Sequence, residues 1–150
     1  MTAVVNLAGG AFDDVFAEKG ISYLNLRVED TPQATLPIEQ TLAFIHDHLD
    51  GAESDDEDEE DSEDHAGGVL VHCRGAHSRS LAICVAWLMQ ARQMSLATAL
   101  ERIKLARGLQ NINHGFLQQL RSFEAKLERE RQRTSRAEKT HDCSIQFDSI

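Results

Sequence analysis

Residues 69–80, VLVHCRGAHSRS, constrain the fold of this chain more than any other segment. The apolar run VLV predicts a buried strand, and LAICVAWLM, which begins at residue 81, predicts a buried helix. A loop between a strand and a helix brings its backbone N–H groups to the helix N-terminus, where the helix dipole favours an anion. The segment therefore predicts an anion-binding loop with Cys73 at its start and Arg79 at its end.

This loop combines a nucleophile with donors for a phosphate. A thiolate is stabilised at a helix N-terminus, so we expect Cys73 to lose its proton easily. The planar guanidinium of Arg79 offers a phosphate two parallel donors. One alternative is a buried structural cysteine beside a surface arginine. Another is a zinc site built from His72, Cys73 and His77, but no CxxC pair or distant His pair completes its tetrahedron. Nothing else in the sequence asks for a metal, and we expect neither a metal nor a cofactor.

The acidity of the chain comes from one tract. Residues 53–64, ESDDEDEEDSED, carry ten of the 25 acidic residues, and the remaining 15 equal the 15 Lys and Arg residues. Such a block repels itself, so we expect a disordered acidic insertion over residues 51–67. The neutral remainder predicts no nucleic-acid partner. It also disfavours a lipid-phosphate substrate, and no apolar run is long enough to predict a membrane segment.

The length of 150 residues predicts one domain with a real core. Three widely spaced cysteines, an odd number, indicate free thiols in a reducing compartment. With no signal peptide evident, we expect the cytosol or the nucleus.

Alternating strand and helix patterns predict an α/β fold with a central, mostly parallel sheet flanked by helices. The expected strands are residues 3–7, 22–28 and 69–71, and the last, being fully apolar, is expected at the centre of the sheet. The expected helices are residues 37–49, 79–92, 95–108 and 113–127. Beyond residue 128 the apolar stripe ends, so residues 129–150 are expected to form a disordered charged tail.

Residues 72–80, HCRGAHSRS, resemble the signature loop of the cysteine-dependent protein phosphatases, most closely the small dual-specificity phosphatases. Their pattern is His-Cys-x-x-Gly-x-x-Arg-Ser/Thr. The resemblance extends over VVNLAGGAFDDVFAEKGISYLNLRVED and INHGFLQQLRSFEAKL, and covers most of residues 3–127. It implies a three-layer phosphatase architecture and a catalytic domain over residues 1–128. The family carries further strands upstream, so either this chain starts late or the N-terminal edge of its sheet is reduced.

The resemblance implies a role for each loop residue. Cys73 attacks the phosphorus of a phosphoprotein and forms a cysteinyl-phosphate. Arg79 clamps two phosphate oxygens, and the Ser80 hydroxyl donates to the sulfur and eases breakdown of the intermediate. The backbone N–H groups that hold the phosphate belong to Arg74, Gly75, Ala76, His77, Ser78 and Arg79.

Three further residues are candidates outside the phosphate-binding stretch. Asp30, in LRVEDTPQ, matches the family's general acid, with a solvated loop carboxylate as the alternative. His72 is either a hydrogen-bonded core histidine or a residue that tunes the cysteine. Asn113 matches the family's Asn before the last helix, where helix capping and loop support are both satisfied by one residue.

The loop departs from the family pattern at one position. The glycine expected three residues after the nucleophile is Ala76, and the glycine stands one place earlier, at Gly75. A positive φ at Ala76 would cost about 1–2 kcal/mol of strain. Gly75 could absorb the change by shifting the turn. We therefore expect reduced rather than lost activity.

The leading interpretation is a phosphatase that hydrolyses phosphotyrosine and phosphoserine/phosphothreonine in phosphoprotein substrates. The first alternative is a pseudophosphatase that binds phosphoproteins without turnover. The second is an interaction module in which the acidic tract contacts a basic partner or the basic C-terminal segment. Seven of the 15 basic residues lie between Arg121 and Lys139.

Overall fold

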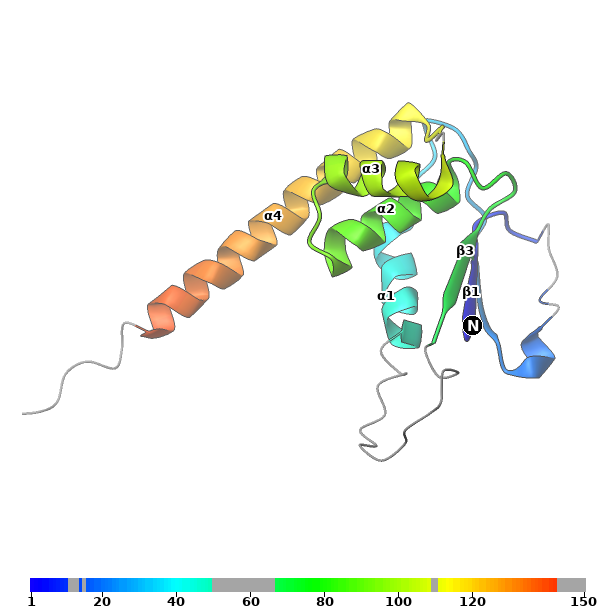
Figure 1. Ribbon diagram of the computed structural model, residues 1–150, viewed down its shortest axis with the longest axis horizontal. Coiled ribbons are helices and arrows are strands. Elements are labelled where there is room, and N and C mark those ends of the chain that lie inside the picture. Colours follow the sequence, from blue (N-terminus) through cyan, green and yellow to red (C-terminus); the bar gives the residue numbers. More distant parts are fainter. Residues whose placement is uncertain (11–13, 15, 50–66, 109–110, 143–150) are drawn as a thin grey trace, which may run out of the picture.

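A computed structural model describes residues 1–10, 14, 16–49, 67–108 and 111–142, with side-chain environments up to residue 137. The elements follow the order β1 (Ala3–Asn6), η1 (Ala17–Lys19), β2 (Ser22–Asn25), α1 (Ile38–Leu49), β3 (Val69–His72), α2 (Arg79–Ala91), α3 (Leu96–Arg107) and α4 (His114–Asp142) (Figure 1). The α/β prediction is confirmed: a small parallel sheet is flanked by helices.

The sheet has the strand order β2-β1-β3, and both neighbours of β1 run parallel to it. All four residues of β1 are buried. The prediction that the strand at residues 69–71 is central is therefore wrong, because β1 is central and β3 has a single described partner. Side chains alternate between the two faces of a strand, and Leu70 of β3 is 47% exposed while its neighbours Val69 and Val71 pack against the core. A run of apolar residues thus does not distinguish an edge strand from a central one here.

The helices bury apolar stripes against the sheet and against one another. Helix α1 buries Ile38, Leu42 and Ile45 at helical spacing, and α2 is buried along most of its length. In Figure 1, α1 stands beside β3. Helices α2 and α3 and the first part of α4 pack together above α1. Because residues 73–78 join the end of β3 to the start of α2, the N-terminus of α2 lies at the carboxyl edge of the sheet, where the anion-binding loop was expected.

Helix α4 is much longer than its apolar stripe. Its buried side chains end at Leu127, but the helix continues to Asp142 and projects away from the other elements (Figure 1). The prediction of a disordered tail is therefore wrong for residues 129–142, while residues 143–150 lie outside the described part. Glu, Arg, Gln, Ala and Lys favour helix without burial, and this segment contains no Gly or Pro. Arg131 also ties it to α2, donating to the carbonyl of Met89 at 2.9 Å.

The acidic tract at residues 53–64 lies outside the described residues, so its expected disorder stays a prediction. Within the described part of the chain, no helix has the length and apolar character needed to cross a membrane.

Candidate active site

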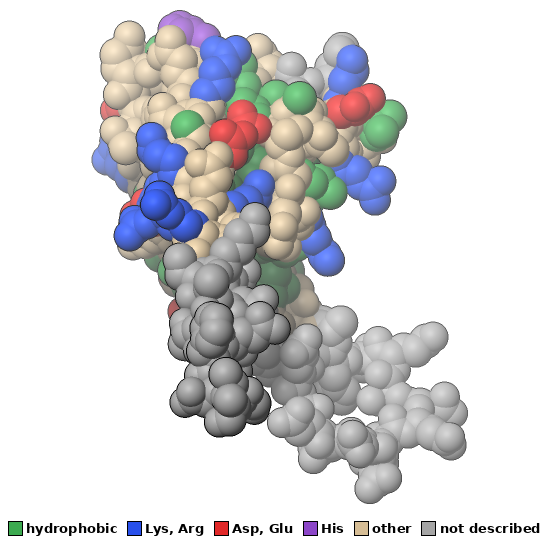
Figure 2. Space-filling model, turned by 90° about the vertical axis from the view of Figure 1, so that its left-hand side faces the viewer, with side chains coloured by type: hydrophobic (Ala, Val, Ile, Leu, Met, Phe, Trp, Pro, Cys, Tyr) green, Lys and Arg blue, Asp and Glu red, His purple; other side chains and the backbone are tan. Residues whose placement is uncertain are grey.

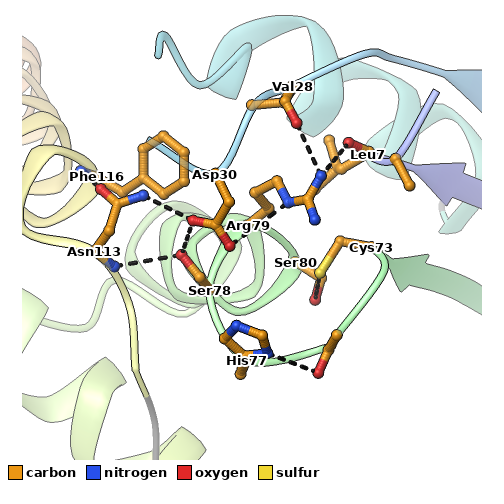
Figure 3. A network of polar contacts seen from close by, with 12 residues as sticks. Leu7, Val28, Asp30, Cys73, His77, Ser78, Arg79, Ser80, Asn113 and Phe116 are labelled. Atoms are coloured by element: carbon orange, nitrogen blue, oxygen red, sulfur yellow. Dashed lines mark hydrogen bonds and ion pairs between the residues drawn. The ribbon is translucent and has the colours of Figure 1, made fainter. Parts of the chain in front are cut away.

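The carboxyl end of β3 and the start of α2 bring the loop's nucleophile and hydroxyl together. Cys73, directly after β3, is 6% exposed, and its sulfur lies 3.3 Å from the hydroxyl oxygen of Ser80 in the first turn of α2 (Figure 3). The predicted pairing of these two side chains is thus present in the structure.

The surroundings of Cys73 favour a thiolate. Burial raises the pKa of the Cys73 thiol, but hydrogen bonds from the Ser80 hydroxyl and from the backbone N–H groups of Ser80, Ala76 and Gly75 outweigh that effect. The pKa of Cys73 consequently lies below its ordinary value. By contrast, burial raises the pKa of Cys84, the other described cysteine, which is also a free thiol. The loop therefore activates one cysteine selectively.

The loop's alanine adopts the strained backbone conformation that the sequence raised as a possibility. Ala76 has a φ of 50°, in the left-handed region, whereas Gly75 is not among the positive-φ glycines. Gly75 therefore does not absorb the missing glycine by shifting the turn. Its role is different: a Cβ on Gly75 would lie 2.4 Å from the ring of His77, which folds back and hydrogen-bonds the Gly75 carbonyl through Nδ1 at 3.0 Å. Glycine at residue 75 makes room for histidine at residue 77.

Arg79, the first residue of α2, is anchored by backbone carbonyls on one side. Its Nη1 donates to the carbonyl of Val28 at 2.9 Å and to that of Leu7 at 3.4 Å. Its Nε is buried and has no hydrogen-bond partner among the described residues, and it lies 3.7 Å from Oδ2 of Asp30, an ion-pair distance (Figure 3). A buried donor without an acceptor is costly, so this Nε is suited to receive an anion.

Asp30 faces the loop from a segment almost fifty residues away in sequence. Its Oδ1 accepts hydrogen bonds from the Ser78 hydroxyl at 2.6 Å and from the Asn113 side-chain amide at 2.8 Å. Asn113 also accepts a hydrogen bond from the Phe116 backbone N–H at 3.0 Å, which caps α4. Asn113 therefore both caps α4 and hydrogen-bonds Asp30, whose carboxylate is held by two donors while its side chain remains 24% exposed.

The segment that carries Asp30 is fixed against α4 by two residues to which sequence reasoning assigned no role. Gln119 accepts from the backbone N–H of Leu36 and donates to the carbonyl of Ala34, both at 2.8 Å. At Gly115, a Cβ would lie 2.0 Å from the carbonyl oxygen of Pro32. A glycine and a glutamine at the start of an otherwise amphipathic helix were the available signals.

The structure brings together at one site the Cys73–Ser80 pair and a network of Asp30, Ser78, Arg79 and Asn113 (Figure 3). Arg74, Gly75, Ala76 and His77 form the exposed part of the loop. His72 is half-buried at the end of β3, in register with Asn6, and both of its expected roles stay open. Among the described residues, no cluster of His, Cys, Asp and Glu side chains has the makings of a metal site.

Comparison with known proteins gives a consistent result. The family model of the dual specificity phosphatase catalytic domain matches residues 1–126. Human dual specificity protein phosphatase 2 is 32% identical over 132 residues, covering 85% of this chain but only 36% of its own length. The chain thus spans about a third of the length of this curated relative.

Solved structures of related proteins share the fold. A crystal structure of human DUSP28 superposes with a TM-score of 0.72 at 29% identity, covering 87% of this chain and 81% of that one. A mouse protein described as a dual specificity phosphatase, crystallised with zinc tungstate, gives a TM-score of 0.68 at 30% identity, covering 87% and 73%.

A parallel sheet, a thiol at a helix N-terminus and an arginine that closes the loop define a cysteine-dependent phosphatase fold. Within that class, the chain belongs to the dual specificity phosphatase catalytic domain family.

Proposed function

We propose that this chain is a protein phosphatase that hydrolyses phosphotyrosine and phosphoserine/phosphothreonine in proteins through a cysteinyl-phosphate intermediate. The observation that carries the proposal is the set of hydrogen bonds to the Cys73 sulfur at the N-terminus of α2, which lower the pKa of the thiol. A protein that only binds phosphate has no need of an activated thiol. Membership of the phosphatase family supports the same reaction class.

In the first step, the Cys73 thiolate attacks phosphorus and the bond from phosphorus to the substrate oxygen breaks. The backbone N–H groups of residues 74–79 hold the three non-bridging oxygens. Arg79, already anchored by the carbonyls of Leu7 and Val28, offers its guanidinium to the charge that spreads over these oxygens.

Asp30 gives its proton to the departing oxygen, so that an alcohol or phenol leaves rather than an alkoxide or phenolate. In the second step Asp30 accepts a proton from water, water attacks phosphorus, and the sulfur–phosphorus bond breaks. Inorganic phosphate is released and the thiolate is regenerated, with the Ser80 hydroxyl stabilising the sulfur as it leaves. Protons and electrons balance without a metal or redox cofactor.

Turnover of a phosphotyrosine and a phosphothreonine peptide tests this proposal, with Cys73→Ser and Asp30→Ala as variants. Cys73→Ser should abolish turnover of both peptides because serine's hydroxyl remains protonated. Asp30→Ala should lower turnover by about 10²–10⁴-fold, the usual contribution of a general acid. Wild-type protein that binds the peptides without releasing phosphate would instead identify a pseudophosphatase.

We further propose that the acidic tract of residues 53–64 contacts a basic partner or the basic C-terminal segment. Helix α4 carries exposed Arg129, Arg133 and Arg136 at a spacing that places them on one face. Figure 2 shows basic side chains at this end of the molecule, with acidic side chains among them. Deleting residues 53–64 should change the binding of such a partner or the mobility of α4, and the difference should vanish at high salt.

The reaction requires a reduced Cys73. We therefore propose that the protein works in the cytosol or the nucleus, where thiols stay reduced. Fractionation of tagged protein tests this, and a secreted protein would contradict it.

A further inference from the structure

We propose that the Ser78 side chain is a positioning group for the general acid: its hydroxyl, together with the Asn113 amide, holds Oδ1 of Asp30 so that Oδ2 carries the transferred proton. This inference rests on the proposed function, in which Asp30 protonates the leaving oxygen. It assigns Ser78 a role beyond its backbone N–H in the phosphate-binding loop.

Ser78 occupies the N-cap of α2 without capping it. Its carbonyl accepts the first helical hydrogen bond, from Ala82 at 2.9 Å, but its side chain accepts none from the first turn. Serine at this position ordinarily bonds the second or third N–H of the helix, as Ser95 does at the N-terminus of α3, accepting from Thr98 at 3.2 Å. The hydroxyl of Ser78 is therefore directed elsewhere.

The Ser78 hydroxyl joins three parts of the chain. It donates to Oδ1 of Asp30 at 2.6 Å, the length of a charge-assisted O–H···O⁻ bond, and accepts from the backbone N–H of Asn113 at 3.3 Å. Ser78 is 1% exposed, so water does not compete for these bonds. A hydroxyl has a single proton to donate, and this geometry commits it to Asp30.

The two oxygens of Asp30 are consequently unlike. Oδ1 accepts two hydrogen bonds, from Ser78 and from the Asn113 amide, and both donors oppose a proton there. Oδ2 is the oxygen nearer to Arg79, whose Nε is 3.7 Å away (Figure 3). A transferable proton therefore belongs on Oδ2, and the two donors on Oδ1 fix the orientation of the carboxyl group, with Oδ2 on the side of Arg79.

The same arrangement serves the nucleophile. The second N–H of α2 is that of Ser80, which donates to the Cys73 sulfur. A capping hydroxyl at Ser78 would compete for this N–H. Because the hydroxyl is occupied by Asp30, the N–H remains available to the thiolate.

The experiment compares two phosphate esters that differ in their need for an acid. The leaving oxygen of a phosphotyrosine peptide has a pKa near 10 and benefits from protonation, whereas para-nitrophenol leaves readily as an anion. Ser78→Ala keeps the backbone N–H and removes the hydroxyl. We expect kcat for the peptide to fall about tenfold more than kcat for para-nitrophenyl phosphate, with KM for the peptide changed by less than about twofold.

A double-mutant cycle with Asp30→Ala shows whether Ser78→Ala slows the peptide reaction through Asp30 or through the phosphate loop. If Ser78 acts through Asp30, Ser78→Ala should cause no further loss in the Asp30→Ala background. An equal loss in both backgrounds, or an equal loss on both substrates, would show that Ser78 acts through the phosphate loop and would overturn the inference. If Asp30→Ala slows only the phosphotyrosine peptide while Ser78→Ala has no effect on either substrate, the positioning role of Ser78 is overturned and the acid role of Asp30 stands. If Asp30→Ala itself affects both substrates equally, the acid assignment in the proposed function fails as well.

Two further variants separate positioning from folding. Ser95→Ala makes the same change at a true N-cap remote from Cys73, and it should lower stability while leaving both substrates unaffected. Asn113→Ser keeps an N-cap oxygen for α4 but removes the amide that bonds Oδ1, so it should show the selectivity of Ser78→Ala. If Ser78→Ala does not fold, Asn113→Ser carries the test, and an equal loss on both substrates overturns the inference.

Discussion

The hydroxyl oxygen of Ser80 lies 3.3 Å from the sulfur of Cys73, inside the first turn of the helix that the sulfur faces. Together with backbone N–H groups, it overcomes the burial of the thiol and lowers its pKa. A lowered pKa keeps the thiolate, the reactive form, present to a lower pH than in a free cysteine. The acid limb of any Cys73-dependent rate therefore depends on Ser80.

Ser80→Ala removes one donor to the thiolate and should raise the pKa of Cys73. As the pH is lowered, reactivity should then disappear at a higher pH than in the wild type. The measurement is the pH dependence of iodoacetamide modification of Cys73, followed by mass spectrometry of its peptide; Cys84, whose pKa is raised by burial, should react slowly throughout. Ser122→Ala, at an exposed position on α4, is the control. An unchanged midpoint in Ser80→Ala would contradict this role.

Ala76→Gly should stabilise the protein and speed turnover. The φ of 50° at Ala76 costs about 1–2 kcal/mol, and the added freedom of glycine in the unfolded chain offsets roughly 0.4–1 kcal/mol of that gain. We expect a net gain of about 0.5–1 kcal/mol in the free energy of unfolding by urea denaturation. Turnover of para-nitrophenyl phosphate should rise as the loop relaxes.

The matched control for this change is Ala125→Gly, at an exposed helical position of α4. It should be destabilising by about 1 kcal/mol, since glycine disfavours helix. If Ala76→Gly lowers the free energy of unfolding by the same amount and does not speed para-nitrophenyl phosphate turnover, strain at Ala76 does not limit turnover.

Gly115→Ala should damage catalysis without touching a catalytic group. The added Cβ would meet the Pro32 carbonyl at 2.0 Å, a backbone contact that must give way, and such overpacking costs about 1–3 kcal/mol. The segment carrying Asp30 would be displaced, so turnover of a phosphotyrosine peptide should fall more than stability alone explains. Gly10→Ala, where a Cβ meets nothing within 4 Å, should leave both stability and turnover unchanged. Wild-type turnover in Gly115→Ala would show that the segment tolerates displacement.

Removing residues 129–150 should leave a folded, active domain. The buried side chains of α4 end at Leu127, and the hydrogen bond from Arg131 to the Met89 carbonyl contributes about 1 kcal/mol. Circular dichroism should show the loss of the helical signal of residues 129–142, with kcat and KM unchanged. A strong fall in thermal stability would mean that the projecting helix supports the core.

Much of the site was predictable because its chemistry is local. The strand, loop and helix around Cys73 follow directly from the order of residues 69–80, and Arg79 and Ser80 lie within one helical turn. The departure from the family pattern left two possibilities open, a positive φ at Ala76 or a turn shifted to Gly75, and the structure has the first. What could not be predicted depends on contacts between distant segments. The Ser78 hydroxyl meets Asp30 across 48 residues, and nothing in the sequence near Ser78 indicates that it leaves its N-cap position.

The fold shows the same division. Helices with apolar stripes were correctly located, but strand order is a property of pairing, and apolar character alone wrongly placed β3 at the centre. The length of α4 was underestimated for a related reason. The apolar stripe ends at Leu127, but the segment after it is helical by intrinsic preference and does not need burial for order.

Gly115 has no functional group, yet the close approach it permits joins the acid-bearing segment to the first turn of α4 through the backbone. We therefore expect the two segments to open together, as one cooperative unit. Amide hydrogen exchange in the first turn of α4 should consequently report on the active site, slowing in step with residues 30–36 when an oxyanion such as tungstate binds. Amide exchange in the first turn of α4 should thus report whether an oxyanion occupies the phosphate loop.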